Sequence, residues 1–138
     1  MVVARGESHT VRSRGGRLLM YQGWADPVLP PEATIGFYES VARKMGASDT
    51  PWFARLFMVP GMGHCMGGPG PDTFDSLDVL ENWVSANRAP ERIVASHLRN
   101  GEADRTRPIC AWPKQPVYTG RGSTDDERNF TCAAPPRK

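Results

Sequence analysis

The chain has 138 residues, of which 17 are Lys or Arg and 15 are Asp or Glu, so its formal net charge is +2. A chain of this length suits one domain and leaves no room for two independent cores. No run approaches the ~18 apolar residues that span a bilayer, and no block of about five like charges occurs. We therefore expect neither a membrane-spanning nor a nucleic-acid-binding protein. The 14 glycines and 13 prolines indicate a loop-rich structure.

The beginning of the chain carries no clear structural signal. Residues 1–16 are polar and follow neither a helical nor a strand period, so we expect them to form a flexible lead-in. Arg5, Arg12 and Arg14 are not accompanied by a continuous apolar segment. The sequence therefore predicts no secretory signal in this chain.

A short apolar run and an amphipathic segment follow. Residues 17–22 end at Gly23 and predict a strand that is buried on both faces, as in a parallel sheet. A helix is expected to begin near Pro31 and to end at Gly46. Its apolar residues recur at helical spacing: Ile35, Tyr38, Val41 and Met45.

The same order is then repeated. After a loop over 47–51, residues 52–59 predict a second buried strand, which leads into the glycine-rich loop 60–68. A second helix is expected over 73–88, capped by Asp72 or Thr73. Its expected apolar stripe consists of Phe74, Leu77, Leu80, Trp83 and Val84.

This order of elements predicts the fold class. Strand, helix, strand and helix in succession are typical of a parallel sheet covered by helices, the α/β class. Residues 17–100 are expected to form this core, with a partly extended piece at 92–98. Residues 101–138 are expected to form a Pro/Gly-rich C-terminal tail. Because two strands cannot complete such a sheet, we expect the chain to be the C-terminal part of a larger α/β protein.

Two residues with catalytic chemistry lie just beyond the expected strands. Asp26 follows the first strand and His64 follows the second. In an α/β sheet the loops at the carboxyl ends of the strands meet, so these side chains can act as an orienting acid and a general base. Their order matches that of the α/β-hydrolases. The alternative is that Asp26 belongs to an ordinary Asp-Pro turn and His64 is a surface residue.

A nucleophile is not evident. None of the serines stands in a strand-to-helix elbow between glycines; they are Ser8, Ser13, Ser40, Ser48, Ser76, Ser85, Ser96 and Ser123. Cys65 could be a nucleophile or, with His64, a metal ligand, but adjacent side chains rarely chelate one ion. The spacing of the other His and Cys residues is not typical of zinc. A disulfide partner outside this chain is the more economical interpretation of an odd cysteine.

Four segments in order along the chain carry a family resemblance. They are GGRLLMYQGWADP (15–27), PGMGHC (60–65), RTRPIC (105–110), and GSTDD (122–126) followed by NFTC (129–132). Together they resemble the tannase and feruloyl esterase family. The resemblance covers residues 15–132. It implies a secreted α/β-hydrolase that cleaves esters of aromatic acids such as gallate, ferulate or a terephthalate monoester.

The resemblance also implies roles for individual residues. Asp26 matches the catalytic acid, His64 the catalytic base, and Leu29 a position that lines the acyl pocket. Cys65 matches the cysteine that forms a disulfide with the residue before the nucleophilic serine.

Two further cysteines match the family's C-terminal disulfide. Cys110 and Cys132 are expected to pair with each other. Two free buried thiols are the alternative, although the odd cysteine count already favours an oxidising compartment.

The sequence also departs from the family. The cysteine-serine nucleophile motif, the oxyanion-hole donors, most of the sheet and the calcium-binding lid have no counterpart, so no metal or other cofactor is expected here. We expect a C-terminal fragment that is inactive alone, whose partners are the missing N-terminal portion and an aromatic ester. The complete protein is expected to be extracellular or periplasmic. The alternative is a non-catalytic module whose strand at 17–22 pairs with another chain.

Overall fold

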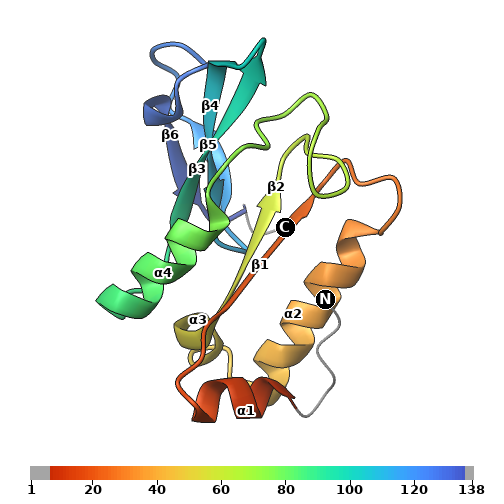
Figure 1. Cartoon of the computed structure of the whole chain (residues 1–138), viewed down its shortest axis with the longest axis vertical. Coiled ribbons are helices and arrows are strands. Elements are labelled where there is room, and N and C mark those ends of the chain that lie inside the picture. The colour runs from red at the N-terminus through yellow and green to blue at the C-terminus, as the bar shows by residue number, and fades with distance from the viewer. Residues whose placement is uncertain (1–6, 136–138) are drawn as a thin grey trace.

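Two parallel strands form the centre of the structure, a computed structural model that describes residues 7–135. β1 (Leu18–Gly23) pairs in parallel with β2 (Ala54–Val59), with residue 18 opposite residue 54 and residue 23 opposite residue 59. Figure 1 shows helices on both sides of this pair. The parallel pairing confirms the prediction from the order of elements.

Helix α2 (Pro31–Met45) covers one face of the pair. Tyr38 and Val41 are buried against the same cluster as Leu56 of β2, as the helical spacing predicts. The helix has proline in its first turn and ends at Gly46, whose φ of 98° is unfavourable for other residues. Both boundaries of the predicted helix are confirmed.

A short helix occupies the region expected to be a loop. α3 (Thr50–Phe53) precedes β2, so the second strand begins at residue 54 rather than 52. Thr50 is fully buried, and its amide and hydroxyl both donate to the Gly46 carbonyl. These bonds turn the chain, which the local sequence pattern did not reveal. Phe53 is buried, as expected for the segment 52–59, but it lies in α3 rather than in the strand.

The opposite face of the pair is covered by α4 (Ser76–Ala86). The helix is shorter than predicted because its cap is Asp75, whose carboxylate accepts from the Asp78 amide. Trp83 is buried as expected, but Leu77 and Val84 are 62% and 60% exposed. The predicted apolar stripe is therefore wrong at these two positions.

The C-terminal region contains more regular structure than expected. β3 (Arg92–Arg99) and β4 (Glu102–Cys110) form an antiparallel hairpin. β5 (Gln115–Tyr118) pairs with β6 (Phe130–Ala133), which follows the 3-10 helix η1 (Glu127–Asn129).

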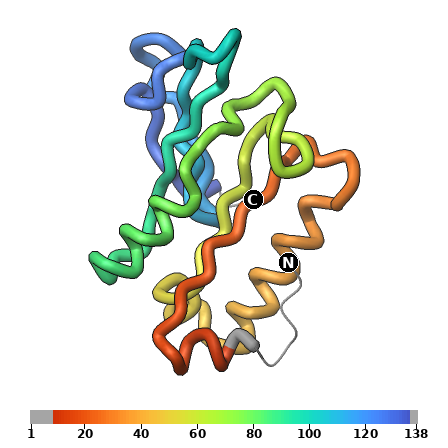
Figure 2. The backbone as a smooth tube through the Cα atoms, viewed as in Figure 1, coloured from red at the N-terminus to blue at the C-terminus, as the bar shows by residue number. Residues whose placement is uncertain are grey.

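β3 agrees with the extended piece expected at 92–98, whereas β4, β5 and β6 correct the expectation of a loop-rich tail. The tube in Figure 2 shows these strands side by side. Ile93 and Ile109 of the hairpin pack with Phe57 of β2, so the hairpin belongs to the main core.

The N-terminal segment also differs from its prediction. Within the expected flexible lead-in, α1 spans Glu7–Ser13, while residues 1–6 lie outside the described range. Val11 packs against the α2 cluster, and Arg12 forms a 2.7 Å ion pair with Asp49. Tertiary contacts, which periodicity does not detect, stabilise this helix. Within residues 7–135, no helix is long and apolar enough to cross a membrane.

A disulfide joins β4 to β6 between Cys110 and Cys132, with a Cα–Cα distance of 5.6 Å, as the resemblance implied. The bond closes a loop with a sequence separation of 22 residues. In the chain-entropy model such a closure contributes about 3 kcal/mol.

Replacing both cysteines of this disulfide with serine is expected to lower the free energy of unfolding by about 3 kcal/mol, measured by urea denaturation.

Reduction provides the matched control for this prediction. Dithiothreitol should bring the unmodified chain to the stability of the double-serine variant and should leave that variant unchanged. Equal urea midpoints for the oxidised chain and the variant would contradict the stabilising role of the disulfide.

Candidate active site

The loops after β1 and β2 leave the sheet at the same edge and cross each other closely. The Trp24 amide donates to the Val59 carbonyl and the Ala25 amide to the Met62 carbonyl, both at 3.0 Å. A Cβ atom on Gly23 would lie 2.0 Å from the Met62 carbonyl oxygen. Only glycine fits this crossing, and the crossing brings the two loops together.

The crossing places Asp26 beside His64. The His64 Nδ1 atom lies 2.8 Å from Asp26 Oδ2. An ionised carboxylate only accepts hydrogen bonds, so Nδ1 carries the proton and Nε2 is the basic nitrogen. The Asp26 side chain is 3% exposed, whereas that of His64 is 44% exposed. The structure therefore brings together the two predicted residues, with the carboxylate covered and the imidazole accessible.

The Asp26 carboxylate is held by four hydrogen-bond donors. Oδ1 accepts from the amides of Val28 and Leu29 at 2.8 and 3.0 Å. Oδ2 accepts from His64 and from Gln22 Nε2, the latter at 3.0 Å. The backbone donors fix the turn after β1, and the side-chain donors fix the carboxylate toward the base.

These contacts determine the ionisation of the acid. Desolvation would raise the pKa of Asp26, but the hydrogen bonds from Leu29, His64 and Val28 outweigh it and lower this pKa to about 2. Because the folded-state pKa is depressed, the ionised group stabilises the fold above its ordinary pKa of about 4. That contribution is lost as the pH falls toward 2. Asp26 is therefore an anion at neutral pH.

The loop after β2, which carries His64, is anchored at its far end to the β3–β4 hairpin. Thr73 and Ser96 exchange backbone hydrogen bonds of 3.0 and 2.8 Å. Arg105 donates to the Pro69 carbonyl at 2.7 Å, and the Gly67 amide donates to Asp72. The β3–β4 hairpin thus supports the loop that carries His64.

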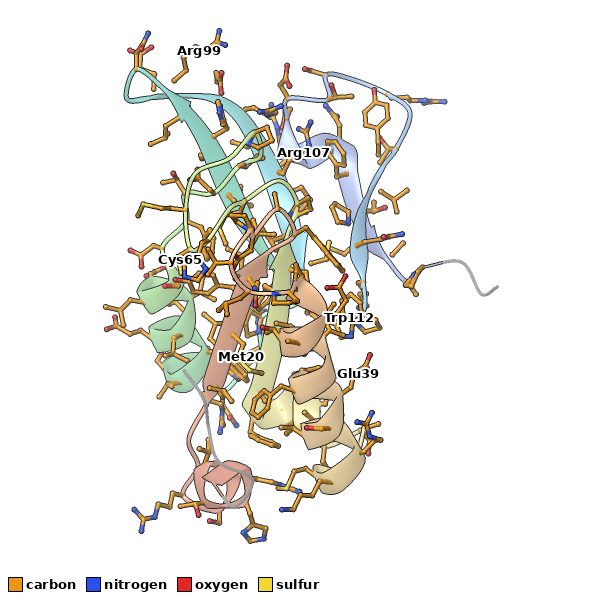
Figure 3. All side chains as sticks on the ribbon, turned by 90° about the vertical axis from the view of Figure 1, so that its right-hand side faces the viewer. Met20, Glu39, Cys65, Arg99, Arg107 and Trp112 are labelled. Atoms are coloured by element: carbon orange, nitrogen blue, oxygen red, sulfur yellow. A yellow bond between two sulfur atoms is a disulfide. The ribbon has the colours of Figure 1, made fainter. Side chains whose placement is uncertain are left out.

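The other predicted site residues lie on the same two loops or in the C-terminal region. Leu29 is 52% exposed and lies in the loop after β1, where its amide donates to Asp26 Oδ1. Cys65, labelled in Figure 3, is a free, exposed cysteine directly after His64. Its predicted pairing with a residue outside this chain stays a prediction. Within residues 7–135, no group of three or more His, Cys, Asp or Glu side chains is placed to hold a metal ion.

A second His–Asp pair lies on the hairpin, away from the strand ends. His97 Nδ1 lies 2.6 Å from Asp104 Oδ1, and the hydrogen bond from His97 lowers the pKa of Asp104. The Asp104 side chain is 38% exposed, against 3% for Asp26. This pair has no position at a parallel-strand end, so it serves as an internal comparison for the first.

Sequence reasoning missed Gln22 and Thr34. Gln22 is buried in β1, and Thr34 of α2 donates to its side-chain oxygen. The available signal was a polar residue in an otherwise apolar strand, since buried polar side chains are almost always hydrogen-bonded.

Comparisons with known proteins identify the family of this chain. A family model described as tannase and feruloyl esterase matches residues 5–133. The mono(2-hydroxyethyl) terephthalate hydrolase of Piscinibacter sakaiensis is 45% identical over 129 residues, covering 91% of this chain and 21% of the relative. A probable feruloyl esterase B of Aspergillus niger is 34% identical, covering 88% of this chain and 26% of the relative.

A solved structure supports the same assignment. The crystal structure of feruloyl esterase B from Aspergillus oryzae superposes with a TM-score of 0.85 at 27% identity, covering 91% of this chain and 28% of that one. The chain spans about a quarter of the length of the relatives it matches. Its fold is thus part of an α/β-hydrolase. From the family match over residues 5–133 and the superposition, the chain belongs to the tannase and feruloyl esterase family, whose members hydrolyse carboxylic esters.

Proposed function

We propose that this chain supplies the acid and the base of a serine esterase that cleaves esters of aromatic acids. The observation that carries the proposal is the covered Asp26 carboxylate 2.8 Å from the Nδ1 atom of the accessible His64. The chain order of acid before base is that of the α/β-hydrolases. The serine would come from the part of the relatives that this chain does not match.

The mechanism follows from the two nitrogen atoms of His64. Nε2 removes the proton of the serine hydroxyl as the serine oxygen attacks the ester carbonyl, and Asp26 stabilises the imidazolium that forms. His64 then protonates the departing alcohol, which leaves an acyl-enzyme. In the second half, His64 takes a proton from water as the water oxygen attacks the acyl carbonyl. The bond between the acyl carbon and the serine oxygen then breaks, and His64 returns the proton to the serine.

Aromatic acids are proposed as the acyl group for two reasons. Exposed apolar side chains lie on both loops of the site: Trp24, Val28, Leu29 and Met66. Relatives are named as feruloyl esterases, a tannase and a terephthalate monoester hydrolase. Leu29 is proposed to line the acyl pocket.

An oxidising location is proposed on the basis of the cysteines. The Cys110–Cys132 disulfide is typical of extracellular or periplasmic proteins. Cys65 is proposed to pair with a cysteine next to the serine, which would tie the base loop to the nucleophile.

A non-catalytic binding module is the second candidate. Within residues 7–135, β1 pairs with β2 on one edge only, which leaves its other edge for a partner strand. This candidate does not account for the covered carboxylate beside an accessible histidine.

A chimera tests the proposal. Residues 5–133 would replace the matching segment of the 45% identical terephthalate monoester hydrolase. We expect the chimera to hydrolyse methyl ferulate or methyl gallate with a kcat/KM about 10-fold or more above that for methyl butyrate. The chain alone should release no acid from these esters.

Three results would contradict the proposal. A folded chimera without esterase activity would remove the acid and base roles. Equal kcat/KM values for the aromatic and aliphatic esters would remove the aromatic preference. Hydrolysis by the chain alone would place the nucleophile within it.

A further inference from the structure

Gln22 is a buried polar side chain at the carboxyl end of β1. Its residue is 8% exposed, in a strand whose other side chains are mostly apolar. Burying an amide is unfavourable unless its hydrogen bonds are made. The partners of Gln22 therefore show what the residue does at this position.

The orientation of the Gln22 amide is determined by its neighbours. Nε2 lies 3.0 Å from both Asp26 Oδ2 and the Leu29 carbonyl oxygen. Both partners only accept hydrogen bonds, so the NH2 group must face them and Oε1 must face the other way. Oε1 accepts from the Thr34 hydroxyl of α2. The reverse orientation would place Oε1 against two acceptor oxygens and would remove the donor to the Leu29 carbonyl.

These contacts form one continuous chain of hydrogen bonds. It runs from Thr34 on α2 through Gln22 on β1 to Asp26, which also accepts from His64. Gln22 also holds the Leu29 carbonyl, while the Leu29 amide donates to the other oxygen of Asp26. Gln22 thus contacts both ends of the turn from Asp26 to Leu29.

We propose that Gln22, oriented by Thr34, is a positioning residue that fixes the Asp26 carboxylate and the Leu29 backbone relative to His64. Without the Gln22 donor, Oδ2 would have His64 as its remaining donor, and the carboxylate could rotate away from the Nδ1 direction. The catalytic importance of this positioning rests on the proposed function. The contact of Gln22 with the Asp26 carboxylate does not depend on that function, so the contact and the function can be tested separately.

The first measurement needs no catalysis. In the full chain, the pKa of Asp26 is followed by the carboxyl 13C chemical shift during an acid titration. Gln22→Leu removes a hydrogen bond to the charged form, so we expect the pKa of Asp26 to rise. Thr34→Val should raise it less, because the amide remains but loses its fixed orientation. Thr34→Ser keeps the hydroxyl and should restore the unmodified titration.

The second measurement is kinetic and uses the chimeric esterase. Gln22→Leu is expected to lower kcat by about 10- to 100-fold while KM stays nearly unchanged, since small misplacements of catalytic groups act on the chemical step. Thr34→Val should lower kcat in the same direction, and Thr34→Ser should restore it. In the Gln22→Leu background, Thr34→Val should have no further effect, because Thr34 acts through Gln22.

The outcomes separate the two proposals. An unchanged Asp26 titration in folded Gln22→Leu would overturn the positioning role, as would an additive effect of the two substitutions. If Gln22→Leu does not fold, Thr34→Val and Thr34→Ser test the positioning role instead. Thr34 is a partly exposed helix residue, so we expect both of these variants to fold. A raised pKa of Asp26 with an inactive unmodified chimera would support the contact and reject the esterase function.

Discussion

Replacing His64 with alanine is expected to lower kcat of the chimeric esterase by about a million-fold. Among residues 7–135, the His64 ring is the group that we propose takes the serine proton and returns it to the alcohol. Asp26 is not expected to substitute, because its carboxylate is covered. A stopped assay of methyl ferulate hydrolysis measures the loss. Binding of the ester should be almost unaffected, because the imidazole acts in the transition state.

His97→Ala is the matched control for this variant. His97 also contacts a carboxylate, at 2.6 Å from Asp104, but it lies on the β3–β4 hairpin rather than at a strand end. Its removal should leave kcat unchanged. A similar loss in both variants would show a general effect on the fold, and full activity of His64→Ala would reject the assignment of the base.

Replacing Asp26 with asparagine is expected to lower kcat by about ten-thousand-fold. The amide keeps the size of the carboxylate but removes its charge, so the imidazolium loses its stabilising partner. The NH2 group also offers His64 Nδ1 a donor, which favours the wrong tautomer. Release of ferulic acid from methyl ferulate measures kcat, and a nearly constant KM would indicate an effect on the chemical step.

Asp104→Asn is the control for the acid. It removes a carboxylate that also contacts a histidine, yet it should leave hydrolysis unchanged, because the Asp104 side chain lies on the hairpin and is 38% exposed. Equal activity of Asp26→Asn and the unmodified chimera would reject Asp26 as the catalytic acid.

Local signals in the sequence explain which parts of the fold could be predicted. Pro31, Gly46 and the spacing of Tyr38 and Val41 determine α2 without any knowledge of the rest of the chain. The parallel pairing followed from the order of elements, because a helical connection of this length returns the chain in the same direction.

Features that depend on distant contacts were missed. Leu77 and Val84 fit the period of a buried helix face, but the period does not tell what covers that face, and both are exposed. Strand β4 was missed because its first half is exposed and charged, while only Pro108, Ile109 and Cys110 are buried. Its structure comes from pairing with β3.

The site likewise has one part that could be predicted from the sequence and one part that could not. The proximity of Asp26 and His64 was predictable, since each lies in the loop after a strand and the carboxyl ends of parallel strands share one edge of the sheet. Gln22 differs from its strand by being polar, but its contact with Thr34 was not predictable, because the bond joins a strand to a helix and has no signature in residue spacing.

The close crossing at Gly23 has a consequence for the entropy of the reaction. The loops after β1 and β2, which carry Asp26 and His64, share backbone hydrogen bonds at residues 24 and 25. Neither loop can therefore move away without breaking these bonds. The freedom of these two side chains to separate is lost once, when the chain folds, and not again in each turnover. The activation entropy of the reaction should therefore reflect the substrate and the serine rather than the assembly of Asp26 with His64.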